Sequence, residues 1–123
     1  MIIGTGVDMV EISRIKKMYD KRPQRSLEKI FGELEKEYIL VKTPPYPHMA
    51  VRFCAKEAFS KALGTGIGRM SLPEFQVVNN SRGKPEAKIT GRANEILQEL
   101  GGKSVHISLS HTKELAIAYV IIT

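Results

Sequence analysis

Three residues of this 123-residue chain have the types and the spacing for acid–base and phosphate chemistry. Glu57 and Lys61 are four residues apart, so a helix would place them on one face. Asp8 follows a β-branched segment, at the point where we expect a buried strand to end. Proteins usually hold Mg²⁺ with one or two carboxylates, while water and phosphate fill the remaining positions. The pattern therefore predicts chemistry on a phosphate, with Asp8 and Glu57 as metal ligands and Lys61 as a phosphate partner.

A surface ion pair is the simpler explanation for Glu57 and Lys61, and it would stabilise a helix by only about 0.2–0.5 kcal/mol. Three features favour chemistry instead. The surrounding helix is small and apolar, its GTGIG exit would let the backbone approach a ligand closely, and Asp8 supplies a second carboxylate. Further cations are available to neutralise phosphate oxygens, namely Arg52, Lys56 and Lys84.

Other catalytic motifs are incomplete in this sequence. The segment GGKS at 101–104 lacks the first glycine of a P-loop, and GTGIG lacks the dinucleotide-binding spacing. His106 and His111 are five residues apart on a predicted strand, so they should point to opposite faces and share no metal. Ser110 precedes a histidine but lies in no G-x-S-x-G elbow.

The first half of the chain is expected to be mostly helical, after a buried strand over residues 2–7. The predicted helices cover about Glu11–Tyr19, a stretch from an N-cap at Ser26 to Ile39 with a possible break at Gly32, and His48–Leu63. Pro23 should end the first unit or begin a loop, and TPPYPH should be a loop. Gly64 should end the last helix. That helix is expected to bury a stripe formed by Val51, Ala55, Ala58, Phe59 and Ala62.

The second half is expected to be mostly strands. Residues 75–79 and 86–90 flank the turn NNSRGKP, which predicts a hairpin. A short helix should cover about Arg92–Leu100, and residues 104–110 and 115–122 should form a second hairpin around HTKE. The inventory predicts an α+β fold in which an antiparallel sheet packs with helices, in a single domain over residues 1–123.

The net charge of +6 favours an acidic partner. Basic residues cluster between Arg14 and Arg25, where Asp20 is the single acid. A solvated helix face would explain this cluster equally well on composition alone. A docking surface for an acidic macromolecule is the more specific hypothesis.

Composition also limits the location of the protein. No apolar run approaches the roughly 20 residues that span a membrane, and the N-terminus lacks the basic start of a secretory signal. The single Cys54 excludes an internal disulfide and fits a reducing compartment. We therefore expect a cytoplasmic protein without a membrane segment, in which Cys54 packs as a small apolar residue rather than reacting.

Four ordered segments together carry a family resemblance: GVD near the N-terminus, RFCAKEAFSKALGTGIG, the RGKP turn and SLSHTKELAIAYV. They resemble holo-[acyl-carrier-protein] synthase, the short bacterial type of 4′-phosphopantetheinyl transferase, over essentially the whole chain. The resemblance implies transfer of 4′-phosphopantetheine from coenzyme A to a serine of an apo acyl carrier protein. Adenosine 3′,5′-bisphosphate would be released, in a step that serves fatty acid biosynthesis. Cys54 departs from the pattern, where an alanine is expected.

The resemblance also implies roles for individual residues. Asp8 and Glu57 would hold Mg²⁺ at the pyrophosphate, and Lys61 would stabilise phosphate charge. Glu57, or a water that it orients, would take the serine proton. The residues that would contact coenzyme A are Arg52, Lys56, Lys61, Gly64, Gly66, Lys84, Pro85, His111 and Thr112.

The implied partner is the acyl carrier protein, which is small and acidic. Its docking face would be formed by Arg14, Lys17, Met18, Lys21, Arg22 and Arg25. The resemblance further implies a homotrimer with each site between neighbouring subunits. A nucleic-acid-binding module would explain the charge but neither Asp8 nor Glu57, and the chain lacks an evident aromatic stacking platform. A non-catalytic carrier-binding protein would not need Asp8, Glu57 and Lys61 together.

Overall fold

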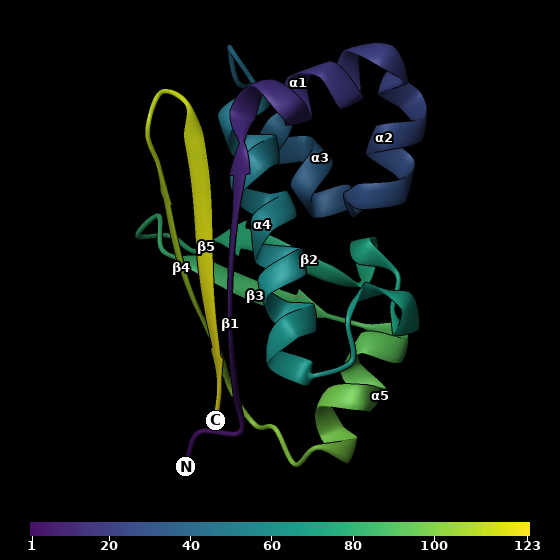
Figure 1. Ribbon diagram of the computed structural model, residues 1–123, viewed down its shortest axis with the longest axis vertical. Helices are drawn as coiled ribbons and strands as arrows, with labels where there is room; N and C mark the ends of the chain where they lie inside the picture. The colour runs from purple at the N-terminus through teal and green to yellow at the C-terminus, as the bar shows by residue number, and fades with distance from the viewer.

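Helix α4 (Tyr46–Leu63) lies at the centre of the molecule, between a three-stranded sheet and a two-stranded sheet (Figure 1). The computed structural model describes residues 1–123, leaving aside the side chain of Ile67. The remaining helices are α1 (Ile12–Lys21), α2 (Pro23–Ile30), α3 (Glu33–Ile39) and α5 (Gly91–Glu99), with short 3₁₀ turns η1 (Ile67–Arg69) and η2 (Leu72–Glu74). The predicted α+β class with antiparallel sheets is confirmed.

The larger sheet has the strand order β1-β5-β4 and is antiparallel throughout. Its strands are β1 (Gly4–Glu11), β4 (Val105–His111) and β5 (Leu115–Ile122). Asp8 pairs with Ala118, which in turn pairs with Leu109, so these residues share a face of the sheet. On this face β5 buries alternate residues, and helix α4 covers it.

The prediction that Asp8 ends a strand over residues 2–7 was wrong. Strand β1 begins at Gly4 and continues to Glu11, because β5 pairs with it along this whole length. Asp8 therefore lies inside the strand, in the row of residues that faces α4. The pairing partner, which is more than a hundred residues away in the sequence, decides where the strand ends.

Two glycines bring β1 directly onto the backbone of α4. A Cβ atom at Gly4 would lie 2.0 Å from the carbonyl oxygen of Ala62, and one at Gly6 would lie 1.9 Å from that of Ala58. Only glycine allows such an approach. The predicted stripe on α4 is buried as expected, and the helix ends at Gly64, whose φ of 78° is left-handed.

The three early helices differ in detail from the prediction. Pro23 occupies the first turn of α2, where its missing N–H costs no hydrogen bond. Ser26 is consequently not an N-cap; it is buried inside α2 and its hydroxyl donates to the carbonyl of Met18 at 3.4 Å. Gly32 does break the helical stretch, and α3 follows it.

The smaller sheet pairs β2 (Phe75–Asn79) with β3 (Pro85–Ile89), as the hairpin prediction required. Phe75 begins β2 and stacks on Phe59 of α4 with ring centroids 4.3 Å apart. The helix predicted over 92–100 and the second hairpin are found within one residue of their expected ends. In the part of the chain that the structure describes, none of the helices has the length and apolar character of a membrane span.

The second face of the larger sheet is apolar and exposed. In Figure 1 the helices all lie to one side of this sheet, and the outward side of β1 and β5 carries none. The large apolar side chains exposed there are Val7, Met9, Leu115, Ile117 and Tyr119. A patch of this kind on two neighbouring strands is typical of a surface that another molecule covers.

Candidate active site

Asp8, Glu57 and Lys61 come together where β1 crosses the last turns of α4. The Lys61 ammonium donates to the main-chain carbonyl of Val7 at 2.9 Å and lies 3.3 Å from Asp8 Oδ1. Strand β1 presents Asp8 to the helix, because Asp8 belongs to the row of the sheet that α4 covers. The structure thus brings together the three residues that the sequence selected as catalytic.

The charges at this cluster leave Glu57 short of positive partners. Partial burial raises the pKa of Glu57 above its usual value, and repulsion by Asp8 raises it further. Lys61 and Arg14 offset part of this effect. A divalent cation would relieve the remaining repulsion, and carboxylate oxygens are the donors that Mg²⁺ prefers.

The protein itself would supply only part of a metal's coordination shell. Among the described residues, no group of three or more His, Cys, Asp or Glu side chains is placed to hold a metal ion. Two carboxylates with open positions around them suit an ion whose other ligands are water and phosphate. The donor set at Asp8 and Glu57 therefore fits Mg²⁺ shared with a substrate.

Cys54 lies beside this cluster but is buried. Its thiol contacts the carbonyl of Ala116 at 3.6 Å, and it is completely enclosed. Burial, with the nearby negative charge of Asp8, raises the pKa of Cys54 to about 12. The thiol therefore stays protonated at neutral pH, which supports the prediction that Cys54 packs rather than reacts.

Arg52 forms a second polar cluster on another side of α4. Its guanidinium donates to the carbonyl of His48 and to Asn79 Oδ1, each at 3.3 Å, and lies 4.2 Å from the ring centroid of Tyr38. Arg52 is 2% exposed, and its Nε has no hydrogen-bond partner among the described residues. A cavity of about 220 Å³ opens here, lined by Tyr38, His48, Val51, Arg52, Asn79, Gly83, Pro85 and Leu109.

The Arg52 cavity is electropositive. Burial lowers the pKa of His48, and the cations Arg52 and Lys42, with the neighbouring His111, lower it further. An unpartnered buried guanidinium nitrogen beside these groups suits an anionic ligand. Sequence reasoning missed Tyr38, His48 and Asn79, because they come from three separate elements and no local spacing links them.

The two clusters lie on different sides of α4. Asp8 belongs to β1, one edge of the larger sheet, whereas the Arg52 cavity is lined by Leu109 of β4, the opposite edge. Arg52 also donates a hydrogen bond to Asn79 of β2. Among the described residues, the side chains of the Asp8 cluster form no hydrogen bond to β2. Each chain therefore carries a carboxylate half and a cationic half separately.

Lys56 lies in the protein core, contrary to the expectation that it contacts phosphate. Its side chain is completely enclosed and pairs with Glu35 of α3 at 2.6 Å. Burial lowers the pKa of Lys56, and the Glu35 carboxylate opposes that effect. Because its ammonium is fully enclosed, Lys56 cannot contact a phosphate in this structure.

The other residues predicted to contact coenzyme A lie around these clusters. Gly64 and Gly66 have positive φ and follow the C-terminal end of α4, whose last turn contains Lys61. Lys84 and Pro85 line a hollow of about 400 Å³ between β3 and β4. The hydroxyl of Thr112 accepts hydrogen bonds from the amides of the β4–β5 turn, which gives this side chain a structural task.

The residues predicted to form a basic docking face lie at the surface of α1 and α2. Arg14, Lys17, Met18 and Lys21 fall on one side of α1, at spacings of three and four residues. A hollow of about 240 Å³ lies between α1 and α2, lined by Met18, Lys21, Arg22, Arg25, Ser26, Lys29 and Ile30. Its lining is mostly apolar and its rim carries cations. Lys29 and Ile30 were missed, because the sequence interpretation ended the first helical unit at Pro23.

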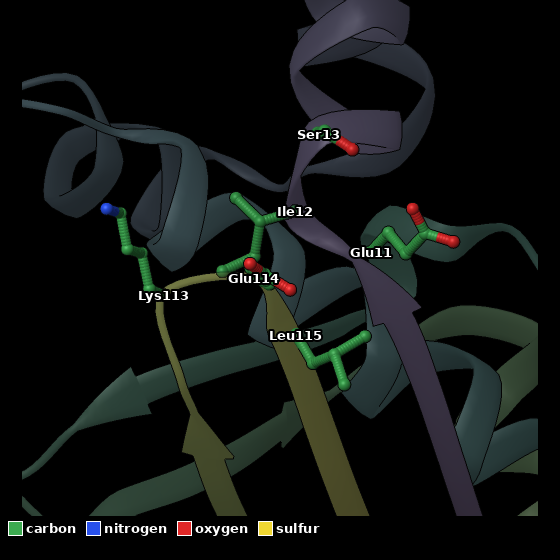
Figure 2. A pocket seen from close by; sticks show the side chains of 6 residues that line it. All are labelled: Glu11, Ile12, Ser13, Lys113, Glu114 and Leu115. Carbon is green, nitrogen blue, oxygen red and sulfur yellow. The ribbon is translucent and has the colours of Figure 1, made fainter.

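A further hollow of about 560 Å³ lies where β1 passes into α1, beside the turn between β4 and β5. Figure 2 shows that Glu11 and Lys113 extend to opposite sides of it, so its charged groups do not converge. The hollow adds no residue to the Asp8 cluster.

Comparison with known proteins identifies the family of the chain. A family model described as the 4′-phosphopantetheinyl transferase superfamily matches residues 4–120. The chain belongs to this superfamily. This phosphopantetheinyl transferase is 46% identical over 123 residues to a holo-[acyl-carrier-protein] synthase of Treponema denticola, covering 99% of this chain and 98% of the relative. The family and the enzyme class predicted from the sequence are thus confirmed.

Solved structures of similar enzymes share the fold of this transferase. The holo-[acyl-carrier-protein] synthase of Neisseria meningitidis superimposes with a TM-score of 0.92 at 33% identity, covering 100% of this chain and 99% of the other. That of Bacillus anthracis, solved in complex with CoA (3′,5′-ADP), gives a TM-score of 0.82 at 38% identity, covering 99% and 96%.

Proposed function

We propose that this transferase moves the 4′-phosphopantetheine group of coenzyme A to a serine of an apo acyl carrier protein, with Mg²⁺, and releases adenosine 3′,5′-bisphosphate. The observation that carries the proposal is the meeting of Asp8, Glu57 and Lys61 between β1 and α4. The names of its relatives, including one solved with coenzyme A, support this choice of substrates.

Asp8 and Glu57 are the residues that would hold Mg²⁺. Bound there, the ion would supply positive charge to the pyrophosphate oxygens of the substrate. Lys61 is held beside Asp8 by its bond to the Val7 carbonyl, so its ammonium faces the same phosphates. This arrangement provides cations for a transition state that gathers negative charge.

The reaction forms one bond and breaks another at the β-phosphorus of coenzyme A. The serine oxygen bonds to this phosphorus, and the bond to the bridging oxygen breaks, with its electron pair leaving on adenosine 3′,5′-bisphosphate. The serine proton passes to Glu57 or to a water that Glu57 orients.

The Arg52 cavity would hold the bisphosphate end of coenzyme A. Arg52 supplies positive charge there, while His48 lines the cavity with a polar ring. Pro85 and Tyr38 supply apolar surface, and His111 lies close enough to influence His48. We assign Lys84, Gly64, Gly66 and Thr112 to its surroundings. The carboxylate half and this cationic half lie on different sides of α4, so we propose that each complete site forms between two copies of the chain.

A homotrimer would place such half-sites against one another. The exposed apolar residues on the outer face of β1 and β5 provide the surface for this contact. Burying them stabilises an assembly by roughly 25 cal/mol per Å² of apolar area.

The acyl carrier protein would dock on the basic face of α1 and α2. The proposed docking residues are Arg14, Lys17, Met18, Lys21, Arg22 and Arg25, joined by Lys29 and Ile30. Arg14 also influences Glu57, so this face lies close to the carboxylate half. We further propose that residues 1–123 act as one domain in the cytoplasm, where the free Cys54 stays reduced.

The transfer is tested by incubating the protein with coenzyme A, Mg²⁺ and an apo acyl carrier protein. Mass spectrometry should show the carrier gaining the mass of one phosphopantetheine group, and a chelator should abolish the gain. A carrier mass that stays unchanged at ample enzyme contradicts the proposal. Added salt should raise the KM for the carrier more than that for coenzyme A, because steering between surface charges is screened.

Sites between subunits are tested by complementation. We would co-express Asp8→Asn chains with Arg52→Gln chains and purify the hybrids through two different tags. Hybrids should regain activity that neither variant has alone, because some sites would combine two intact halves. Hybrids no more active than the separate variants would contradict the between-subunit arrangement.

A further inference from the structure

Lys56 and Glu35 form an ion pair that is completely enclosed by protein. Their side chains are 0% exposed, with Lys56 Nζ 2.6 Å from Glu35 Oε1. The same ammonium donates to the carbonyl of Leu72 at 3.1 Å and to that of Phe75. One lysine of α4 therefore fixes the main chain at η2 and at the start of β2.

The Glu35 carboxylate extends this connection to α3. It accepts the amide of Gly32 at 3.1 Å and, through its second oxygen, the amide of Val77 at 3.0 Å. Gln76 adds another link, because its side-chain oxygen accepts the amides of Leu34 and Glu35. The pair thus joins three elements, α3, α4 and β2, almost entirely through main-chain atoms.

Stability alone is a poor explanation for such a pair. Removing two charges from water costs several kcal/mol per ion, and apolar residues of the same volume often stabilise a core as well or better. A network with every group satisfied specifies one arrangement of the surrounding elements. The arrangement specified here is the place of β2 along α4.

That arrangement reaches the Arg52 cavity directly. Arg52 lies one turn before Lys56 on α4, and its partner Asn79 lies four residues after Phe75 on β2. Two cations of one helix are therefore bonded to two points of one strand. Asn79 pairs with Pro85 across the hairpin, so the same strand also places Pro85 at the cavity.

We propose that the Lys56–Glu35 pair is a positioning device for the Arg52 cavity, which holds the β2–β3 hairpin on α4 and thereby sets the affinity for coenzyme A. Neither residue touches substrate; both act through the hairpin. The proposal rests on the proposed function, since it takes this cavity to bind the bisphosphate end of coenzyme A.

The decisive variant is Glu35→Gln, which keeps the side-chain shape but replaces one acceptor oxygen by an NH₂ group. Either the Val77 amide, or Lys56 together with the Gly32 amide, then loses its acceptor. The matched control is Glu33→Gln in the same helix, where the carboxylate is 86% exposed and pairs with Lys36. We expect Glu35→Gln to raise the KM for coenzyme A and the Kd for adenosine 3′,5′-bisphosphate about tenfold. The kcat and the KM for the carrier protein should change less than about threefold, as should all constants of Glu33→Gln.

Gln76→Met keeps the test available should Glu35→Gln fail to fold. It removes the second link between β2 and α3 at a half-buried position, and should raise the same two constants about two- to threefold. Unchanged constants in a folded variant would overturn the proposal, as would a kcat loss without a change in KM.

A double-variant cycle separates positioning from general stability. If Glu35 acts through the hairpin, its effect on Kd should largely disappear in an Asn79→Ala background, where the contact with Arg52 is already lost. Additive effects would mean that the pair only stabilises the fold, and would overturn the proposal. Failure of the wild-type protein to transfer phosphopantetheine would instead reject the proposed function, so the two failures are distinguishable.

Discussion

Helix α4 joins a lysine to a carboxylate at two places, and the two pairs lie in opposite surroundings. Lys56 and Glu35 are 0% exposed and 2.6 Å apart. Lys61 and Asp8 have side chains 54% and 21% exposed, at 3.3 Å. The enclosed pair is surrounded by protein hydrogen bonds, whereas the open pair leaves an ammonium and carboxylate oxygens accessible. The same two side-chain types therefore hold elements together in one place and remain open to a ligand in the other.

The comparison has an energetic consequence. A buried charge that loses its partner is strongly destabilising, whereas an exposed ion pair contributes about 0–1 kcal/mol. Variants of the enclosed pair should therefore affect stability first, and variants of the open cluster should affect activity first.

Lys56→Met should give the largest loss of stability. It leaves the Glu35 carboxylate buried without a cation, which costs about 3–5 kcal/mol. Urea denaturation followed by circular dichroism measures the change. A loss below about 1 kcal/mol would mean that the pair is not the enclosed one described here.

Asp8→Asn should give the largest loss of activity with a small effect on folding. It removes half of the carboxylate pair, so we expect a fall in kcat of at least about 100-fold. Initial rates of carrier-protein modification measure it, with Glu37→Gln at an exposed position of α3 as the control. Activity near that of the wild type would reject the metal assignment.

Lys61→Met tests the open pair from its cationic side. The unfolding free energy should fall by at most about 1 kcal/mol, because the ammonium is exposed. The transfer rate should fall about 10- to 100-fold, since a phosphate partner is lost. Together with Lys56→Met, this variant compares two lysines one turn and one residue apart. Equal stability losses in the two would contradict the contrast between them.

The pH dependence at His48 should be the smallest effect. The folded protein lowers the pKa of His48 below its ordinary value of 6.5, through burial, the cations Arg52 and Lys42, and the neighbouring His111. The unfolded chain then binds more protons, so this contribution to stability is complete above pH 6.5 and is lost as pH falls through the folded pKa. Thermal melts of the wild type and of His48→Gln should be compared between about pH 7.5 and about pH 5, which lie on either side of the ordinary histidine pKa. The melting temperature should fall less on acidification in the variant than in the wild type. Parallel profiles would contradict this assignment.

Periodicity in the sequence predicted most of the fold. The buried stripe of α4, its end at Gly64 and the two hairpins depend on local signals, namely apolar spacing, a left-handed glycine and turn residues. Local signals failed where a distant partner decides the outcome. Strand β1 continues past Asp8 because β5 pairs with it, and Pro23 begins a helix although a proline more simply suggests an end.

The candidate site was predicted only in part, again because local patterns do not show which distant residues become partners. Asp8, Glu57 and Lys61 stood out by chemical type, and the structure brings them together. Lys56 has the same type as Lys61 and lies one residue before Glu57, yet it points into the core. Charge and spacing could not separate the two lysines, because what distinguishes them is Glu35, on a different helix.

The contact of Gly4 and Gly6 with the backbone of α4 affects how well the distance between Asp8 and Glu57 withstands sequence change. The separation between Asp8 and Glu57 is set by main-chain atoms in direct contact, rather than by side chains stacked between strand and helix. Exchanges among apolar core residues elsewhere can therefore accumulate over evolutionary time without changing that spacing. A single methyl group at position 4 or 6 would push the strand away from the helix and separate the two carboxylates.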